Sequence, residues 1–184
     1  MHFLRPHFVQ CRPELWRQLI MELGRGYSET GLFPSEVIAE FNGWVVILEI
    51  GDDNEVRIST PFINPEKLSL YAARSTTVGH PEAPKAAEPT LDNDFTLRSN
   101  DLVQAGTLFA EETIRPWLRR LSGYCIELKA ADGTFDYLHP EGVDMLLLTA
   151  HFDPRDVDLL EQHYALFGEV VQGLCLISSA YTRE

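Results

Sequence analysis

The segment DFTLRSND, at residues 94–101, constrains the fold of this chain more than any other, because it predicts a strand that runs directly into a helix. Apolar and polar residues alternate over residues 95–98, which is the two-residue period of a strand. The next three residues, SND, carry side-chain oxygens that can accept hydrogen bonds from the first amides of a helix. We therefore expect a helix from about Asp101. The polar residues Asp94 and Arg98, together with this SND run, could instead form a functional cluster, but strand alternation and helix capping account for all of them.

Downstream of this segment, the pattern predicts further helices and strands in turn. The helix from Asp101 meets Pro116, which has no amide donor, so we expect a kink or two short helices. Residues 124–129 alternate as a strand. Residues 143–150, VDMLLLTA, form an almost continuous apolar run, which is typical of a central strand buried on both faces.

Turn and cap signals delimit the last two of these elements. Asp132 and Gly133 predict a hairpin turn between the strand at 124–129 and the strand at 143–150. Asp153 is expected to cap a final helix with Pro154 at its first position, and the apolar stripe of that helix reaches Cys175. This helix should be the longest element and should cover the sheet.

The N-terminal half reads as a helix followed by a meander of strands. Leucines at steps of four predict an amphipathic helix over residues 13–24. Asn42 and Gly43 separate two strand-like runs and predict a tight hairpin. Alternation over residues 55–60 and at 68–74 predicts two further strands.

Taken together, these elements predict an α+β fold, with an antiparallel sheet of about seven to eight strands and two or three helices packed on one face. A chain of 184 residues fits a single domain over 1–184. The alternative is two lobes, 1–74 and 92–184, joined by a flexible linker at 75–91. That linker has three prolines and no apolar period, and whether it has a function of its own stays open.

Charge and cysteine content restrict the partners and the compartment. The chain has 15 Lys and Arg against 28 Asp and Glu, a net charge of −13, which repels phosphate backbones and anionic lipid headgroups. We therefore expect no nucleic-acid partner, and the basic residues Arg115, Arg119 and Arg120 are interpreted as a solvated helix face. No apolar stretch approaches the ~20 residues of a membrane helix, and three cysteines without CxxC spacing are typical of a reducing compartment. A cytoplasmic protein with no membrane contact is expected.

The residues that best suggest chemistry lie around the predicted strand at 143–150. His139, Glu141, Asp144, His151 and Asp153 are all possible metal ligands. A strand at about 3.3 Å per residue places His139 and His151 roughly 25 Å or more apart, too far for one ion. We therefore expect no metal site and keep His139, Glu141, His151 and Asp153 as polar candidates only.

Other catalytic patterns are missing from the sequence. Cys125 falls in a predicted strand and Cys175 in a predicted amphipathic helix, positions where buried unreactive thiols are usual. The acidic pairs Asp52–Asp53 and Glu111–Glu112 are interpreted as solvated residues in a turn and on a helix. Neither the phosphate-binding loop nor the dinucleotide fingerprint occurs, so we expect no cofactor.

Four segments also carry a resemblance to a known group of proteins: PFINPEKLSLY at 61–71, DNDFTLRSND at 92–101, HPEGVDMLLL at 139–148 and LLEQHYALFGEVVQGLCLI at 159–177. Together they resemble an uncharacterised bacterial protein family, over about residues 55–180. The resemblance implies a bacterial cytosolic protein of unknown function and assigns no catalytic residue.

An ordered fold pattern without a chemical constellation favours a non-enzymatic binding or assembly module, with a protein partner or a second copy of the chain as its ligand. The alternative is a small-ligand-binding protein or a hydrolase that uses polar residues near His139 or His151.

Overall fold

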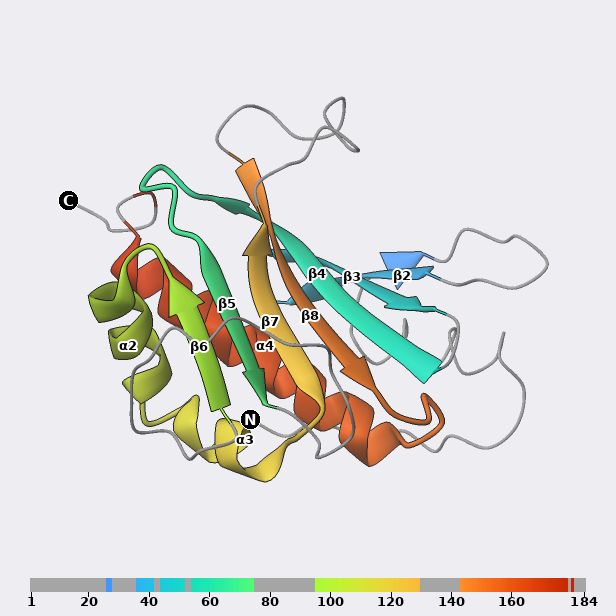
Figure 1. The fold of residues 1–184 in the computed structure, drawn as a ribbon. Helices are drawn as coiled ribbons and strands as arrows, with labels where there is room; N and C mark the ends of the chain where they lie inside the picture. Colours follow the sequence, from blue (N-terminus) through green and yellow to red (C-terminus); the bar gives the residue numbers. More distant parts are fainter. Residues whose placement is uncertain are drawn as a thin grey trace.

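The computed structural model describes residues 26–27, 36–41, 44–51, 54–74, 95–129, 143–178 and 180, with side chains from residue 44 onward. Within these residues the fold is α+β, as expected, with one antiparallel sheet and helices α2 (Leu102–Ala110), α3 (Arg115–Arg120) and α4 (Val157–Ile177). In Figure 1, α4 runs behind the sheet, and α2 and α3 lie beside β6 and against α4. None of the described helices is long and apolar enough to cross a membrane.

The sheet follows the order β1-β2-β3-β4-β8-β7-β5-β6. Its strands are β1 (Gly26–Tyr27), β2 (Glu36–Phe41), β3 (Trp44–Ile50), β4 (Glu55–Ile63), β5 (Leu70–Arg74), β6 (Phe95–Ser99), β7 (Tyr124–Lys129) and β8 (Val143–His151). Six of them, β3 to β8, have described side chains. The expected hairpin around residues 42–43 is confirmed by the pairing of β2 with β3, in which Phe41 lies opposite Trp44.

The strand order is strongly non-local. β4 pairs along its whole length with β8, and β5 inserts between β7 and β6. The buried amide of Asn64, just after β4, donates to a carboxylate oxygen of Asp144 in β8 at 2.5 Å, across a separation of 80 residues. Strands from before residue 75 and from after residue 94 therefore interleave in one sheet, with β8 and β7 between β4 and β5.

One face of the sheet is packed against the helices. Alternate residues of β3, β4, β5, β7 and β8 point toward α4 and form the core with it. On the sheet side these are Val46, Leu48, Val56, Ile58, Phe62, Leu70, Ala72, Tyr124, Ile126, Leu128, Leu146, Leu148 and Ala150. The register aligns them in rows, such as Ile58, Leu148 and Ile126 across three strands. Rows of this kind let α4 bury apolar side chains along most of its length.

The opposite face carries no described helix and is the face seen in Figure 1. Its residues are half-buried or exposed, except for buried Ser59. This differs from the expectation that the run at 143–150 is buried on both faces. Only the helix side of β8 is fully buried, and among the described helices α4 contacts that strand. We call the other side the helix-free face.

The structure confirms two of the expectations for the helices and contradicts one. The side chain of Asp101 accepts a hydrogen bond from the Gln104 amide and caps α2, as expected. Pro116 lies in the first turn of α3, so the two short helices are confirmed. The expected cap of the last helix is wrong. Asp153 accepts from the Arg155 amide in a turn, and the cap of α4 is Asp156, three residues later.

Several expectations lie outside the described residues. They are the helix at 13–24, the linker at 75–91, the turn at Asp132 and Gly133, and the candidates His139 and Glu141.

Candidate binding face of the sheet

The structure separates the polar candidates that it describes. His151 ends β8 on the helix-free face, and its Nε2 lies 3.6 Å from a carboxylate oxygen of Glu55 on the neighbouring strand. Asp153 lies beyond the strand and pairs with Nε of Arg155 at 3.1 Å. Hydrogen bonds from Arg155, first from its backbone amide, hold the pKa of the Asp153 carboxyl below its usual value. His151 and Asp153 therefore have different partners, and both are exposed.

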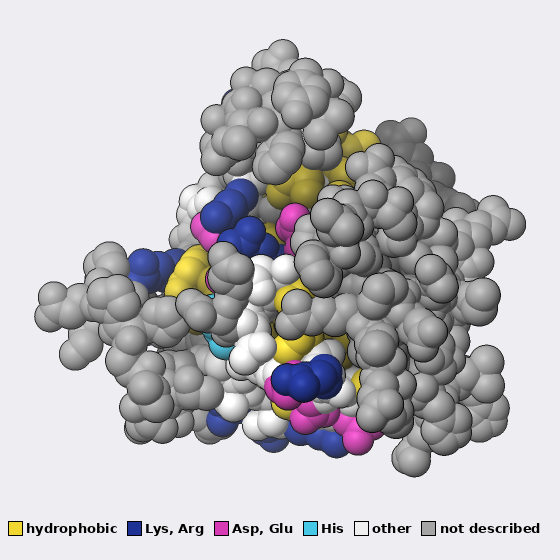
Figure 2. Space-filling view, turned by 90° about the vertical axis from the view of Figure 1, so that its right-hand side faces the viewer, with side chains coloured by type: hydrophobic (Ala, Val, Ile, Leu, Met, Phe, Trp, Pro, Cys, Tyr) yellow, Lys and Arg dark blue, Asp and Glu magenta, His cyan; other side chains and the backbone are white. Residues whose placement is uncertain are grey.

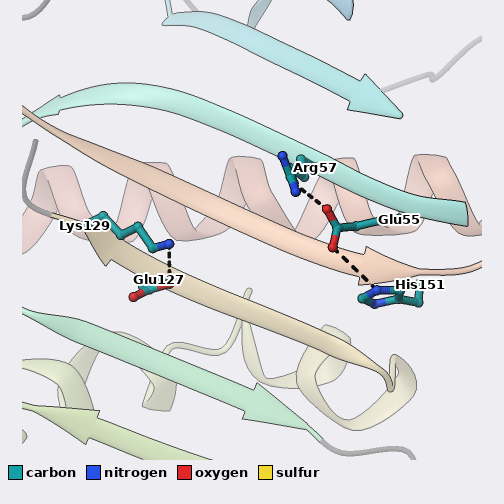
Figure 3. Close-up of polar contacts among 5 residues, drawn as sticks. All are labelled: Glu55, Arg57, Glu127, Lys129 and His151. Carbon is teal, nitrogen blue, oxygen red and sulfur yellow. Dashed lines mark ion pairs between the residues drawn. The ribbon is translucent and has the colours of Figure 1, made fainter. Parts of the chain in front are cut away.

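Ion pairs lie at two places on the helix-free face, one at the His151 end of β8 and one on β7, where Lys129 lies opposite Met145. Glu55 uses its second carboxylate oxygen to contact Nε of Arg57 at 2.5 Å, so it bridges Arg57 and His151. On β7, Nζ of Lys129 lies 3.4 Å from Glu127. Figure 3 shows these five side chains over β4, β8 and β7, with α4 on the other side of the sheet. Pairs this exposed contribute little to stability, about 0–1 kcal/mol each, so their main effect is on the polarity of the face.

At the end of the face away from His151, β3, β4 and β8 carry apolar side chains, and Lys129 of β7 borders them opposite Met145. Val45 and Ile63 are 53% and 50% exposed. Pro61 lies opposite Met145 and Ile63 opposite Val143 in the β4–β8 register. We call Val45, Pro61, Ile63, Val143 and Met145 the apolar end.

A third group lies where β7, β5 and β6 run side by side. Tyr71 of β5 is opposite Glu127 on one side and Arg98 on the other. The Arg98 guanidinium lies over the Tyr71 ring, 5.5 Å from its centre. Burial raises the pKa of Tyr71. Tyr71 and Arg98 are both half-buried on this face of the sheet.

Arg98 is the unusual member of this group. Its Nε and Nη2 are buried, and no described residue offers either of them a hydrogen-bond acceptor. The ion pairs found among the described residues leave Arg98 without a carboxylate, because Glu127 is paired with Lys129. The sequence alternation shows that Arg98 lies on the other face of its strand from Phe95 and Leu97, and it does not predict the partners of Arg98. The contact of Arg98 with Tyr71 cannot be read from the sequence, because it depends on the pairing of β5 with β6.

The described thiols and the buried histidine do not form a nucleophilic site. Burial raises the pKa of Cys125, and it raises the pKa of Cys175 to about 11, so both stay protonated at neutral pH. His163 contacts Phe152 and Tyr124 in the core and hydrogen-bonds the Leu159 carbonyl. The ring contacts and the hydrogen bond of His163 thus involve neither thiol. In the described ranges, no group of three or more His, Cys, Asp or Glu residues could hold a metal ion.

Charges of both signs are mixed at the surface. Figure 2, turned by 90° from Figure 1, shows Lys and Arg beside Asp and Glu among the described side chains, with hydrophobic side chains between them. The exposed residues Arg115, Arg119 and Arg120 of α3 agree with the solvated helix face expected from the sequence.

Comparison with known proteins bears on the fold alone. No family model matches the chain, and no curated protein matches it. Among solved structures, the mycobacterial trehalose monomycolate transport factor A, TtfA, is similar, with a TM-score of 0.51 and 8% sequence identity over 77% of this chain and 71% of that chain. At this identity the likeness shows a shared arrangement of strands and helices.

Proposed function

We propose that this chain is a non-enzymatic, cytoplasmic binding module that docks a protein partner on the helix-free face of its sheet. The observation that carries the proposal is the apolar end of that face, where Val45 and Ile63 are half exposed beside the half-buried residues Pro61 and Met145. Contiguous exposed apolar surface with a polar margin is typical of a protein interface. The Lys129–Glu127 pair supplies a polar margin, because Lys129 lies opposite Met145.

Charge favours a different protein over a second copy of the chain. Two copies at −13 each repel one another, whereas a basic partner is attracted and its association is accelerated. The occupant that we propose for the helix-free face is therefore a basic protein.

A non-enzymatic role is supported by the chemistry of the described groups. The thiols of Cys125 and Cys175 are protonated at neutral pH, and His151 and Asp153 are bound to separate partners on the surface. The structural neighbour TtfA is named as a transport factor, and at 8% identity it contributes the fold alone.

The test places a photo-crosslinking residue at Ile63, on the helix-free face, or at Leu176, which is 73% exposed on α4. Both sites are exposed apolar positions, so they differ mainly in the face that they sample. We expect position 63 to form a covalent adduct with one basic protein in cells and position 176 to form none with it. The purified partner should then bind Ile63→Glu at least ~10-fold more weakly than wild type, because a charge at an apolar contact is desolvated without a partner.

Two outcomes would contradict the proposal. One is the absence of any adduct from position 63. The other is equal binding of the purified partner to wild type and Ile63→Glu, with Leu176→Glu as the control. Turnover of a general phosphatase, esterase or glycosidase substrate that is lost in His151→Ala would instead favour the hydrolase alternative.

A further inference from the structure

The helix side of β3 is as closely covered as the middle of the sheet. Val46 and Leu48 are each 1% exposed, although β3 lies two strands from β8, the strand that α4 contacts. A helix with its side chains is about 10–12 Å wide and strands are about 4.8 Å apart, so α4 covers about one strand on each side of β8. In Figure 1, α4 passes behind β5, β7 and β8, and β3 lies beyond β4. A further element therefore packs beneath β3.

The flank of α4 that faces β4 and β3 is buried as well. α2 and α3 contact α4 on its other flank, where a Cβ at Gly173 would meet Leu108 and Ile114. Gly173 lies about 120° around the helix from buried Phe167 in one direction, and Gly168 lies about 100° from it in the other. Gly168 is also buried, and without a side chain it allows a neighbouring element to approach α4 closely. The groove between α4 and β3 is therefore occupied.

The sequence contains one segment with the pattern of such an occupant. Residues 13–24 carry Leu15, Leu19 and Leu23 at steps of four, the apolar stripe of an amphipathic helix. Only Arg25 separates this segment from β1, which begins at Gly26. The other long segments of the sequence between described strands fit less well, because residues 75–91 have no apolar period and residues 130–142 contain a turn signal and few large apolar residues.

The position of β1 places the segment at the groove. β1 pairs with β2 and β2 pairs with β3, so the start of β1 lies two strand spacings, about 10 Å, from β3. A helix of twelve residues is about 18 Å long, which is enough to run beneath β3. In the β2–β3 register, Val37 is opposite Leu48 and Ala39 is opposite Val46, so the apolar rows of the sheet continue to β2.

Charge favours the same occupant. The first 25 residues contain four arginines and two glutamates, whereas the whole chain has a net charge of −13. This positive segment is therefore attracted to the acidic remainder of the chain.

From these observations we propose that residues 13–24 form a helix that docks in the groove between α4 and the helix side of β2 and β3. There it buries Leu15, Leu19 and Leu23 and completes the cover of the sheet. This contact lies on the helix side, so it does not depend on the proposed docking function and leaves the helix-free face to the protein partner.

The docked helix can be tested in the full chain by NMR. Nuclear Overhauser contacts are recorded between methyl groups, with assignment of the leucine and valine methyls. We expect contacts from the Leu19 methyls to the methyls of Val46 and Leu48, and helical chemical shifts over residues 13–24. Contacts from the same segment to the α protons of Gly168 should place the helix beside α4.

Two variants with the same added charge separate the apolar stripe from the rest of the segment. Leu19→Glu places a carboxylate in the groove, where it cannot be solvated, so hydrogen exchange of the Val46 and Leu48 amides should become at least ~10-fold faster. Gln18→Glu changes a residue outside the stripe and should leave the exchange rates unchanged. If Leu19→Glu does not fold, Leu19→Ala gives the same comparison with a smaller increase.

Three results would overturn the proposal. The first is a set of contacts that joins Val46 and Leu48 to residues 75–91 or 130–142 in place of the N-terminal segment. The second is a set of unstructured chemical shifts over residues 13–24 in the wild-type chain. The third is equal hydrogen exchange of the β3 amides in the position-19 variant and in Gln18→Glu.

Discussion

His163 is the one buried histidine among the described side chains, 2% exposed on the inner side of α4. Its Nδ1 lies 2.7 Å from the Leu159 carbonyl, which can only accept, so Nδ1 carries the proton and Nε2 is left without one. Nε2 is buried and has no hydrogen-bond partner among the described residues. Phe152 stacks on the ring at 4.7 Å. A second proton would place a charge among apolar groups, and burial therefore lowers the pKa of His163 below 6.5.

This lowered pKa predicts a loss of stability in mild acid. The unfolded chain binds a proton at His163 near pH 6.5, whereas the folded chain resists it, so the free energy of unfolding falls as the pH drops from 6.5 toward the folded pKa. The limiting slope is about 1.4 kcal/mol per pH unit. Urea denaturation at pH 7, 6 and 5 should show a smaller decrease for His163→Phe than for wild type.

The control for this prediction is His151→Gln, which removes an exposed histidine beside Glu55 and should keep most of the wild-type pH dependence. Equal pH dependence of wild type and His163→Phe would show that His163 is not the group responsible.

At the scale of elements, α4 packs against α2 and α3 through a glycine. A Cβ at Gly173 would lie 2.5 Å from Cδ1 of Leu108 and 3.2 Å from Cδ1 of Ile114, and both side chains are fully buried. A Cβ at Gly106, in α2, would have no neighbouring side chain within 4 Å. The two glycines thus share helical backbone and differ in the space beside them.

Alanine at these glycines should have opposite effects. Gly106→Ala should raise the free energy of unfolding by about 1 kcal/mol, the difference in helix propensity. Gly173→Ala gains the same propensity but overpacks the contact with Leu108, which costs about 1–3 kcal/mol, so its net effect should be neutral to destabilising. Chemical denaturation of both variants measures the difference. A Gly173→Ala protein as stable as Gly106→Ala would mean that Leu108 shifts without cost.

Local sequence signals predicted most elements, because each depends on neighbouring residues. Asp101 caps α2 and Pro116 divides the helices, as their chemistry requires. Asp153 failed as a cap because an aspartate followed by Pro154 serves a turn as well as a helix start, and Asp156 competes for the role. The contact of Arg98 with Tyr71 was not predicted, because it exists only once β5 pairs with β6, which the sequence does not specify.

At the scale of the whole molecule, β4 and β5 belong to the part of the chain before residue 75, and their partners β8, β7 and β6 belong to the part after residue 94. A fragment that lacks residues 1–74 therefore loses the strand between β6 and β7. The remaining sheet edge and the core under α4 would both be exposed.

We predict that the fragment 95–184 does not fold by itself, as measured by dispersion of its NMR spectrum and by cooperativity of urea unfolding. Addition of a separately produced fragment 1–74 should restore both properties, because it supplies β4 and β5. The control is the intact chain cut once between residues 75 and 94, which should stay assembled. Cooperative unfolding of 95–184 alone would favour the two-lobe interpretation.

The bond between Asn64 and Asp144 joins residues 80 positions apart. At about 5–20 residues per second, a ribosome needs roughly 4–16 s to make that stretch. During this time β4 has left the ribosome without β8, and its apolar row of Val56, Ile58 and Phe62 has no helix to cover it. The interval during which a chaperone can act on the nascent protein is thus determined by the order of strands in the sheet.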